Sequence, residues 1–158
     1  MIIVVDQREK APFGFQGNAY EGITTETGTL FIGDYSVKGL EESVAVERKS
    51  LPDLIMCLSR ERDRFEKELI RSKGLDSFLV VVESSFEELA HGRYRSQMDP
   101  HAAAQSVMAF GARYRCGFFF AGSRPAAEYV TASFLRQYVK SAEKKFRAVM
   151  KASEVKTA

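Results

Sequence analysis

The sequence contains little of what secreted and membrane-spanning proteins require. Only two of its 158 residues are cysteines, Cys57 and Cys116, and each stands alone among apolar neighbours, so neither a disulfide framework nor a CxxC zinc site can form. No apolar run approaches the roughly 20 residues of a membrane span, and the N-terminal run, Ile2–Val5, is shorter than a signal peptide requires. We therefore expect a reduced, cytoplasmic protein with no membrane partner.

Histidine and linker residues are also scarce. The two histidines, His91 and His101, have a spacing that fits no HxxxH zinc motif. Only four prolines occur, and no tract rich in glycine, serine and proline divides the chain. The composition, 45% apolar and 28% charged, is that of one globular domain. We expect a single domain over residues 1–152, followed by a frayed C-terminal tail, residues 153–158.

The net charge of +2 is unevenly distributed. Residues 1–59 contain five basic and nine acidic side chains, whereas residues 124–158 contain eight basic and three acidic ones. An acidic first third beside a basic last third is compatible with a metal-dependent enzyme that acts on a polyanion, and equally with solvated helix faces.

Apolar stretches bounded by turn residues predict six strands, at Ile2–Val5, Glu21–Thr25, Thr29–Ile32, Val44–Lys49, Phe78–Val82 and Gly117–Ala121. The first and the last two are almost entirely apolar, as in strands that are buried on both faces. The pattern therefore predicts an α/β fold, in which helices flank both faces of a central sheet.

The segments between these strands have helical periodicity. An apolar stripe runs over residues 51–69, with Ser50 as a candidate N-cap and Pro52 in the first turn. A further helix is expected to begin at residues 99–100, where aspartate precedes proline, and a long one, whole or broken in two, to run over residues 124–152.

Acidic residues stand at or near the ends of four predicted strands. They are Asp6, Asp34, Glu47 and Glu83. Carboxylates at the edge of a buried sheet can converge on one ion, although a chain that leaves a sheet also simply becomes polar. Together, the four acidic positions favour a functional site at this edge of the sheet.

The segment Val44–Lys49 is the most specific part of this pattern. Because side chains alternate along a strand, Glu47 and Lys49 point to the same face. A hairpin return around Gly39 can bring Asp34 beside them. Asp34, Glu47 and a main-chain carbonyl would suit Mg²⁺ or Mn²⁺, and phosphodiester hydrolysis needs such a cation beside a lysine. The competing interpretation is a surface ion pair between Glu47 and Lys49.

A longer string carries a family resemblance. Gly33-Asp34-Tyr35 followed by Val46-Glu47-Arg48-Lys49-Ser50-Leu51-Pro52-Asp53 resembles the GD…ERKxxxD signature of the XPF-family (xeroderma pigmentosum group F) structure-specific endonucleases. The opening Asp6-Gln7-Arg8-Glu9, the arginine-bearing segment at Arg64 and the strand that ends at Glu83 are similar to that family as well. The resemblance runs through residues 2–122.

The resemblance implies a restriction-endonuclease-like fold, with a central mixed sheet flanked by helices, and metal-dependent cutting of branched DNA such as flaps, forks or junctions. It makes Asp34 and Glu47 the metal ligands, Lys49 the cation that positions water and Asp53 a further acid of the catalytic set. Asp6, Arg8, Arg48 and Glu83 would support the site. Arg48 alternates to the face opposite Glu47, so a structural ion pair competes with any direct role for it.

The chain also departs from the family pattern. Eukaryotic and archaeal members usually add a tandem helix-hairpin-helix domain, and no Gly-x-Gly hairpin pair follows Gly122 here. The sequence is similar to small bacterial or phage proteins that carry the nuclease domain only. We therefore expect a prokaryotic or phage-encoded enzyme of DNA repair, recombination or phage replication.

Basic and aromatic residues outside the signature are candidates for contacts with DNA or with a second subunit. Arg64 is expected beside the active site, and the loop Arg93-Tyr94-Arg95 has the composition to clamp phosphates and stack on an unpaired base. Because Phe118 and Phe120 cannot share a face with Phe119, and family nuclease domains pair through this half of the domain, a homodimer is a hypothesis.

Two other functions stay open. A nuclease-fold subunit that binds DNA without cutting it is the alternative from another class. Hydrolysis of RNA, or of duplex DNA without preference for branches, is the third.

Overall fold

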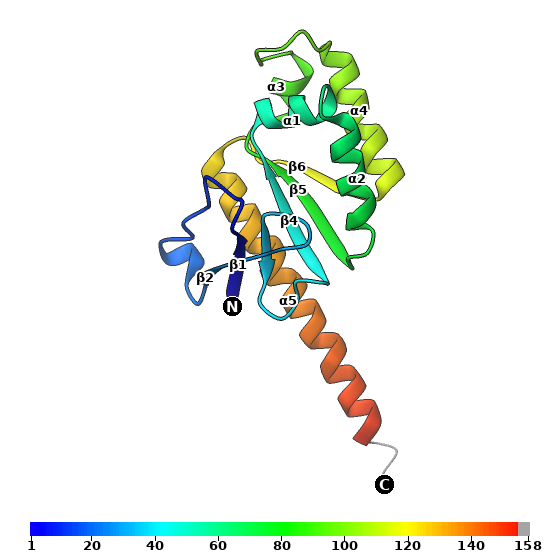
Figure 1. Cartoon of the computed structure of the whole chain (residues 1–158). Coiled ribbons are helices and arrows are strands. Elements are labelled where there is room, and N and C mark those ends of the chain that lie inside the picture. The colour runs from blue at the N-terminus through cyan, green and yellow to red at the C-terminus, as the bar shows by residue number, and fades with distance from the viewer. Residues whose placement is uncertain (155–158) are drawn as a thin grey trace.

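A six-stranded mixed sheet forms the centre of the computed structural model, which describes residues 1–154 (Figure 1). The strands are β1 (Ile2–Asp6), β2 (Thr24–Gly28), β3 (Tyr35–Val37), β4 (Val44–Lys49), β5 (Ser77–Val82) and β6 (Gly117–Phe120). They lie in the order β2-β1-β3-β4-β5-β6. Strand β3 pairs antiparallel with β1 and β4, and the other neighbours are parallel.

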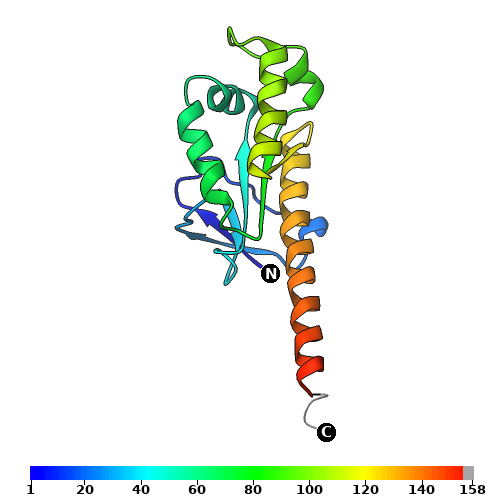
Figure 2. The ribbon, with the colours of Figure 1, turned by 90° about the vertical axis from the view of Figure 1, so that its right-hand side faces the viewer.

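Helices cover both faces of this sheet (Figure 2). They are α1 (Leu51–Leu58), α2 (Arg62–Ser72), α3 (Phe86–Ala90), α4 (Pro100–Tyr114) and α5 (Arg124–Glu154), and a 3₁₀ turn, η1, covers Asn18–Tyr20. Because side chains alternate along β5, Val80 and Val82 pack with α1, α2 and α4, whereas Val81 packs on the face that α5 covers. The prediction of a central sheet flanked on both faces is confirmed.

Helix α5 is one unbroken helix of 31 residues. Ala127, Ala132 and Leu135 pack on the sheet, and the C-terminal half extends beyond it (Figures 1 and 2). The helix includes residues 153 and 154 of the expected tail, and the rest of that tail lies outside the described residues. No helix within residues 1–154 has the length and apolar character to cross a membrane.

Two strand predictions differ from the structure. Residues 29–32 are not a strand, because the Leu30 N–H donates to the buried carboxylate of Asp6 and not to a neighbouring strand. The strand expected at residues 21–25 forms at Thr24–Gly28, where it pairs with β1 as a polar edge strand. The short strand β3 and the five-residue helix α3 were not predicted.

The helix starts are confirmed. Ser50 and Asp99 are N-caps whose side chains accept hydrogen bonds from Asp53 N at 3.3 Å and from Ala102 N at 2.9 Å. The apolar stripe over residues 51–69 belongs to two helices, because the chain turns at residues 59–61 between α1 and α2.

Candidate active site

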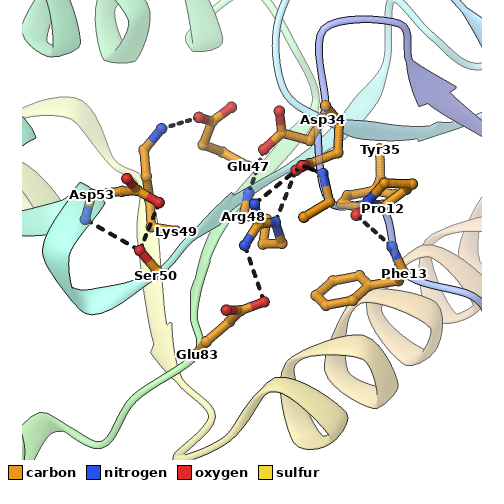
Figure 3. Close-up of polar contacts among 12 residues, drawn as sticks. Pro12, Phe13, Asp34, Tyr35, Glu47, Arg48, Lys49, Ser50, Asp53 and Glu83 are labelled. Atoms are coloured by element: carbon orange, nitrogen blue, oxygen red, sulfur yellow. Dashed lines mark hydrogen bonds and ion pairs between the residues drawn. The ribbon is translucent and has the colours of Figure 1, made fainter.

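The β3–β4 hairpin places Asp34 beside Glu47 (Figure 3). Asp34 N donates to Val46 O at 2.8 Å, and Asp34 O accepts from Asp6 N at 2.8 Å, so the residue is held between β4 and β1. Gly33, which precedes it, has φ 80°, and a Cβ added there would lie 2.9 Å from the Cβ of Ala45. Only glycine fits this close approach, which explains the Gly-Asp pair of the signature.

Asp34 and Glu47 form a partly desolvated pair of carboxyl groups. Burial raises the pKa of Asp34 to about 6, and the hydrogen bond from Arg48 N, at 2.8 Å, opposes this effect only in part. Burial and the nearby Asp34 raise the pKa of Glu47 well above its ordinary value. Two like charges held at a buried edge favour a cation between them.

Lys49 extends the same face of β4. Its ammonium donates to Glu47, and it lies 5.5 Å from the ring centroid of Phe65 on α2. Burial alone would lower the pKa of Lys49, but attraction to Glu47 outweighs it and the pKa is raised. The expected side-by-side placement of Glu47 and Lys49 is therefore present, in a largely buried ion pair instead of a surface one.

Asp53 reaches the site from the first turn of α1. The Ser50 hydroxyl donates to Asp53 Oδ2 at 2.6 Å, which fixes this carboxylate at the start of the helix (Figure 3). Its side chain lines the same cavity as Asp34, Glu47 and Lys49. The four residues of the predicted catalytic set thus line one cavity.

Arg48 points to the opposite face, as the alternation of β4 predicts (Figure 3). Its guanidinium binds both carboxylate oxygens of Glu9, at 2.8 and 3.1 Å, and donates to Glu83 at 3.1 Å. Arg124 of α5 donates to the same Glu83 oxygen at 2.6 Å. Arg48 and Glu83 therefore join the N-terminal loop, β4, β5 and α5 beneath the site. Arg48 is among the residues that line the cavity, and Glu83 is not.

Asp6 and Arg8 form the rim. The buried carboxylate of Asp6 accepts from Arg8 N, Arg8 Nε and Leu30 N at 2.7 to 2.8 Å. Although burial raises the pKa of Asp6, these hydrogen bonds outweigh it and the pKa is lowered. The largely exposed guanidinium of Arg8 is thereby held at the edge of the cavity.

An open cavity of about 390 Å³ joins these groups. One face of α2 forms part of its wall through Arg64, Glu68 and Arg71, which are spaced by four and three residues. Arg64 lies beside the cavity, as expected, and its guanidinium pairs with Glu61 at 3.4 Å. Glu68 and Arg71 were missed as site residues, although the helical spacing from Arg64 could have identified them.

The second group of predicted DNA contacts lies elsewhere. The ring of Tyr94 packs against the core, and its hydroxyl donates to Met98 O at 3.1 Å. Arg95 lines a separate groove beside α1, and Arg93 lies 3.8 Å from Glu87. The structure does not bring this loop into the cavity that holds Asp34.

The carboxylates are few but of a type that suits a hard divalent cation. No cluster of three or more histidine, cysteine, aspartate or glutamate side chains within residues 1–154 could hold a metal ion. Mg²⁺ commonly uses only one or two protein carboxylates and takes its other ligands from water and substrate phosphate. Asp34 and Glu47, with raised pKa values that a cation would reverse, fit that requirement.

Comparisons with known proteins agree with this geometry. The family model described as ERCC4 domain matches residues 5–134. The chain is similar to the solved structure of XPF from Aeropyrum pernix, with a TM-score of 0.69 and 19% identity over 97% of this chain and 73% of that one. The same archaeal protein in complex with DNA matches with a TM-score of 0.65 and 20% identity, over 89% of this chain and 66% of that one. A search of curated proteins finds no match. The fold is therefore restriction-endonuclease-like, as expected.

Proposed function

The chain belongs to the ERCC4 domain family, and from this premise we propose that it is a metal-dependent DNA endonuclease that hydrolyses phosphodiester bonds at branched DNA. The family membership confirms the XPF-family resemblance of the signature. One observation carries the proposal: Asp34, Glu47, Lys49 and Asp53 line a single open cavity. With a divalent cation held by its carboxylates, a cavity with these groups would have the chemistry that phosphodiester hydrolysis requires.

Asp34 and Glu47 are the residues that would hold Mg²⁺ or Mn²⁺. When bound, such a cation supplies Lewis-acid polarisation of a phosphoryl oxygen and lowers the pKa of water. Asp34 is fixed from both sides, by the N–H of Arg48 and by the backbone pairing with β1 and β4. The chain thus contributes two oriented carboxylates at a fixed place.

Lys49 has a distinct role in this proposal. Its raised pKa keeps the ammonium protonated, so it cannot act as a general base. A buried cation beside Glu47 can instead orient water and stabilise the negative charge that develops on the phosphorane. Asp53, whose carboxylate is fixed by Ser50, adds a hydrogen-bond acceptor for water at the same edge.

Basic side chains around the cavity would bind the DNA backbone. Arg8 and Lys10, which follow β1, and Arg64 and Arg71, which lie on α2, all line the cavity. We assign these side chains to phosphates on either side of the bond that is cut, since arginine and lysine supply most backbone contacts. The structure titled "XPF from Aeropyrum pernix, complex with DNA" supports DNA as the polyanion.

Cleavage of end-labelled fork, 3′-flap, duplex and single-stranded DNA, with Mg²⁺ or Mn²⁺, tests the proposal. Wild type should cut branched substrates, and Asp34→Ala and Glu47→Ala should each lose cleavage while retaining DNA binding. Glu42→Ala, at an exposed carboxylate in the β3–β4 turn, is the matched control and should cut as wild type does. If wild type binds DNA but cuts none of the substrates, the protein is a DNA-binding subunit that does not cut. If the protein cuts RNA, or cuts plain duplex DNA as well as branched DNA, the proposal of branched DNA as the substrate is wrong.

We also propose a homodimer through α4 and β6. Strand β6 is at the edge of the sheet, and Phe86, Met108, Phe118 and Phe120 line an apolar cavity of about 460 Å³ beside it. Phe86 and Met108 are exposed, and exposed apolar patches of this kind mark contact surfaces. A monomer mass by light scattering at tens of micromolar protein would exclude this dimer, and Met108→Arg should dissociate it.

A further inference from the structure

Phe31 is an exposed aromatic side chain in the wall of the cavity that holds Asp34. Of the large apolar side chains in residues 1–154, none is more exposed: 75% of Phe31 is accessible. Its two neighbours, Leu30 and Ile32, are only 2% and 3% accessible. Phe31 therefore points away from the core, and it lines the cavity together with Ile32, Gly33 and Asp34.

The segment that carries Phe31 is firmly anchored. Leu30 N donates to Asp6 Oδ2 at 2.7 Å, and Leu30 O accepts from the guanidinium of Arg8 at 2.8 Å. Beyond Gly33, the backbone of Asp34 pairs with β4 and β1. The position of the ring is thus set by the same hydrogen bonds that fix the acidic site and Arg8.

Phe31 and Arg8 together can bind the two parts of a nucleotide, its base and its phosphate. A phenyl face can stack on any base, since every base has a π-face, and an adjacent guanidinium can bind the phosphate of the same strand. A base inside a duplex is stacked on both sides and presents only its edge, so a ring at this position can engage only a base that is out of the stack.

We propose that Phe31 is a stacking platform for one unpaired base next to the phosphodiester that is cut, and that it gives the site a preference for DNA with unpaired nucleotides. The inference rests on the proposed function in that the strand in the cavity is DNA. Asp6 acts here as a positioning residue, because its carboxylate holds both Leu30 and Arg8.

The test measures binding without divalent cations, so that no cleavage intervenes. Wild type and variants are titrated against fluorescein-labelled single-stranded, forked and fully paired DNA of equal length. Phe31→Ala should weaken binding to the single strand and the fork by about 5- to 150-fold, the range for stacking of one base, and leave duplex affinity unchanged. Phe31→Trp should retain the preference and Phe31→Leu should lose it.

A second readout locates the contact directly. A single 5-iodouracil in the unpaired arm should photocrosslink to Phe31, and mass spectrometry identifies the crosslinked peptide. The control is Phe146→Ala, at a phenylalanine with 65% of its surface accessible on the projecting part of α5, which should change neither the crosslink nor the affinities.

The outcomes separate this inference from the nuclease proposal. Equal weakening on duplex and single strand by Phe31→Ala, unchanged affinity on all substrates, or full retention by Phe31→Leu would each overturn the stacking role. If wild type shows the expected binding preference but cuts nothing in Mg²⁺ or Mn²⁺, the stacking role stands and the nuclease proposal falls. If wild type cuts DNA and Phe31→Ala keeps the same ratio of single-strand to duplex affinity, the nuclease proposal stands and the stacking role falls.

Discussion

The backbone N–H of Arg48 donates to Oδ2 of Asp34 at 2.8 Å, while the guanidinium of the same Arg48 points away from Lys49 and binds Glu9 (Figure 3). One residue of β4 therefore connects two layers of the molecule. Above it lies the acidic pair, and below it lies the ion network that joins Glu9, Glu83 and Arg124. The arginine of the signature is accordingly assigned a positioning role.

Replacing Arg48 should destabilise the protein strongly. Arg48→Met leaves Glu9, whose side chain is 4% accessible, as a buried carboxylate without its cation, which typically costs about 3–5 kcal/mol. Urea unfolding followed by circular dichroism measures the loss. Arg124→Met is the matched control, because its side chain contacts the same Glu83 but is 41% accessible, and it should lose less than half as much. Equal losses in the two variants would contradict the role assigned to Arg48.

Strand alternation made the two faces of β4 predictable. In the segment Val44–Lys49 the period of two places Glu47 and Lys49 together and Arg48 opposite them, and no tertiary information is needed for that result. The partners of Arg48 could not be predicted in the same way. Glu9 lies 39 residues away in a loop, and only the order of the strands brings it beneath β4.

Removing the charge of Asp34 should stabilise the protein in the absence of divalent cations. Because the pKa of Asp34 is about 6 in the fold and its ordinary value is 3.8, the native state holds a proton between these values that the unfolded chain has lost. Stability therefore falls as pH rises through this window, and at pH 7.5 ionised Asp34 is unfavourable. Asp34→Asn should raise stability by the order of 2 kcal/mol, visible as a higher Tm in EDTA.

Addition of Mg²⁺ or Mn²⁺ should reverse that difference. A cation that binds the folded state raises the Tm of wild type, and Asp34→Asn, which lacks one of the two proposed ligands, should respond little. The comparison is made by scanning calorimetry at pH 7.5 and pH 5. A Tm for Asp34→Asn below that of wild type in EDTA at pH 7.5 would contradict the expected cost of the buried charge.

Side-chain anchoring explains where sequence reasoning was wrong near the site. Residues 29–32 have the apolar content of a strand, and Leu30 and Ile32 are indeed buried. The hydrogen bonds of Leu30 go to Asp6 and Arg8 instead of to a neighbouring strand, which a pattern of hydrophobicity does not encode. For the same reason the pattern gave no indication that Phe31 would stand exposed beside the acids.

Gly33→Ala should damage the site without touching a catalytic group. A Cβ at this position would meet the Cβ of Ala45 at 2.9 Å and Val46 O at 3.1 Å, and φ 80° is itself unfavourable for alanine. We expect a stability loss of about 1–3 kcal/mol together with a large loss of cleavage, because Asp34 follows directly. Gly39→Ala is the control, since φ is 81° there but an added Cβ has nothing within 4 Å. It should lose stability from the backbone alone and keep its activity per folded molecule.

The salt dependence of DNA binding should identify the phosphate contacts of α2. Arg64 lines the cavity with its side chain 78% accessible, so a phosphate can reach it with little rearrangement. Arg64→Ala should weaken binding to all DNA substrates alike and lower the slope of log affinity against log salt by about one. Lys151→Ala removes an equal charge from the projecting end of α5, away from the sheet (Figure 1), and should leave the slope unchanged. Each phosphate that a basic side chain neutralises adds about one unit to this slope, independent of the DNA sequence. Equal slopes for wild type and Arg64→Ala would therefore show that Arg64 contacts no phosphate.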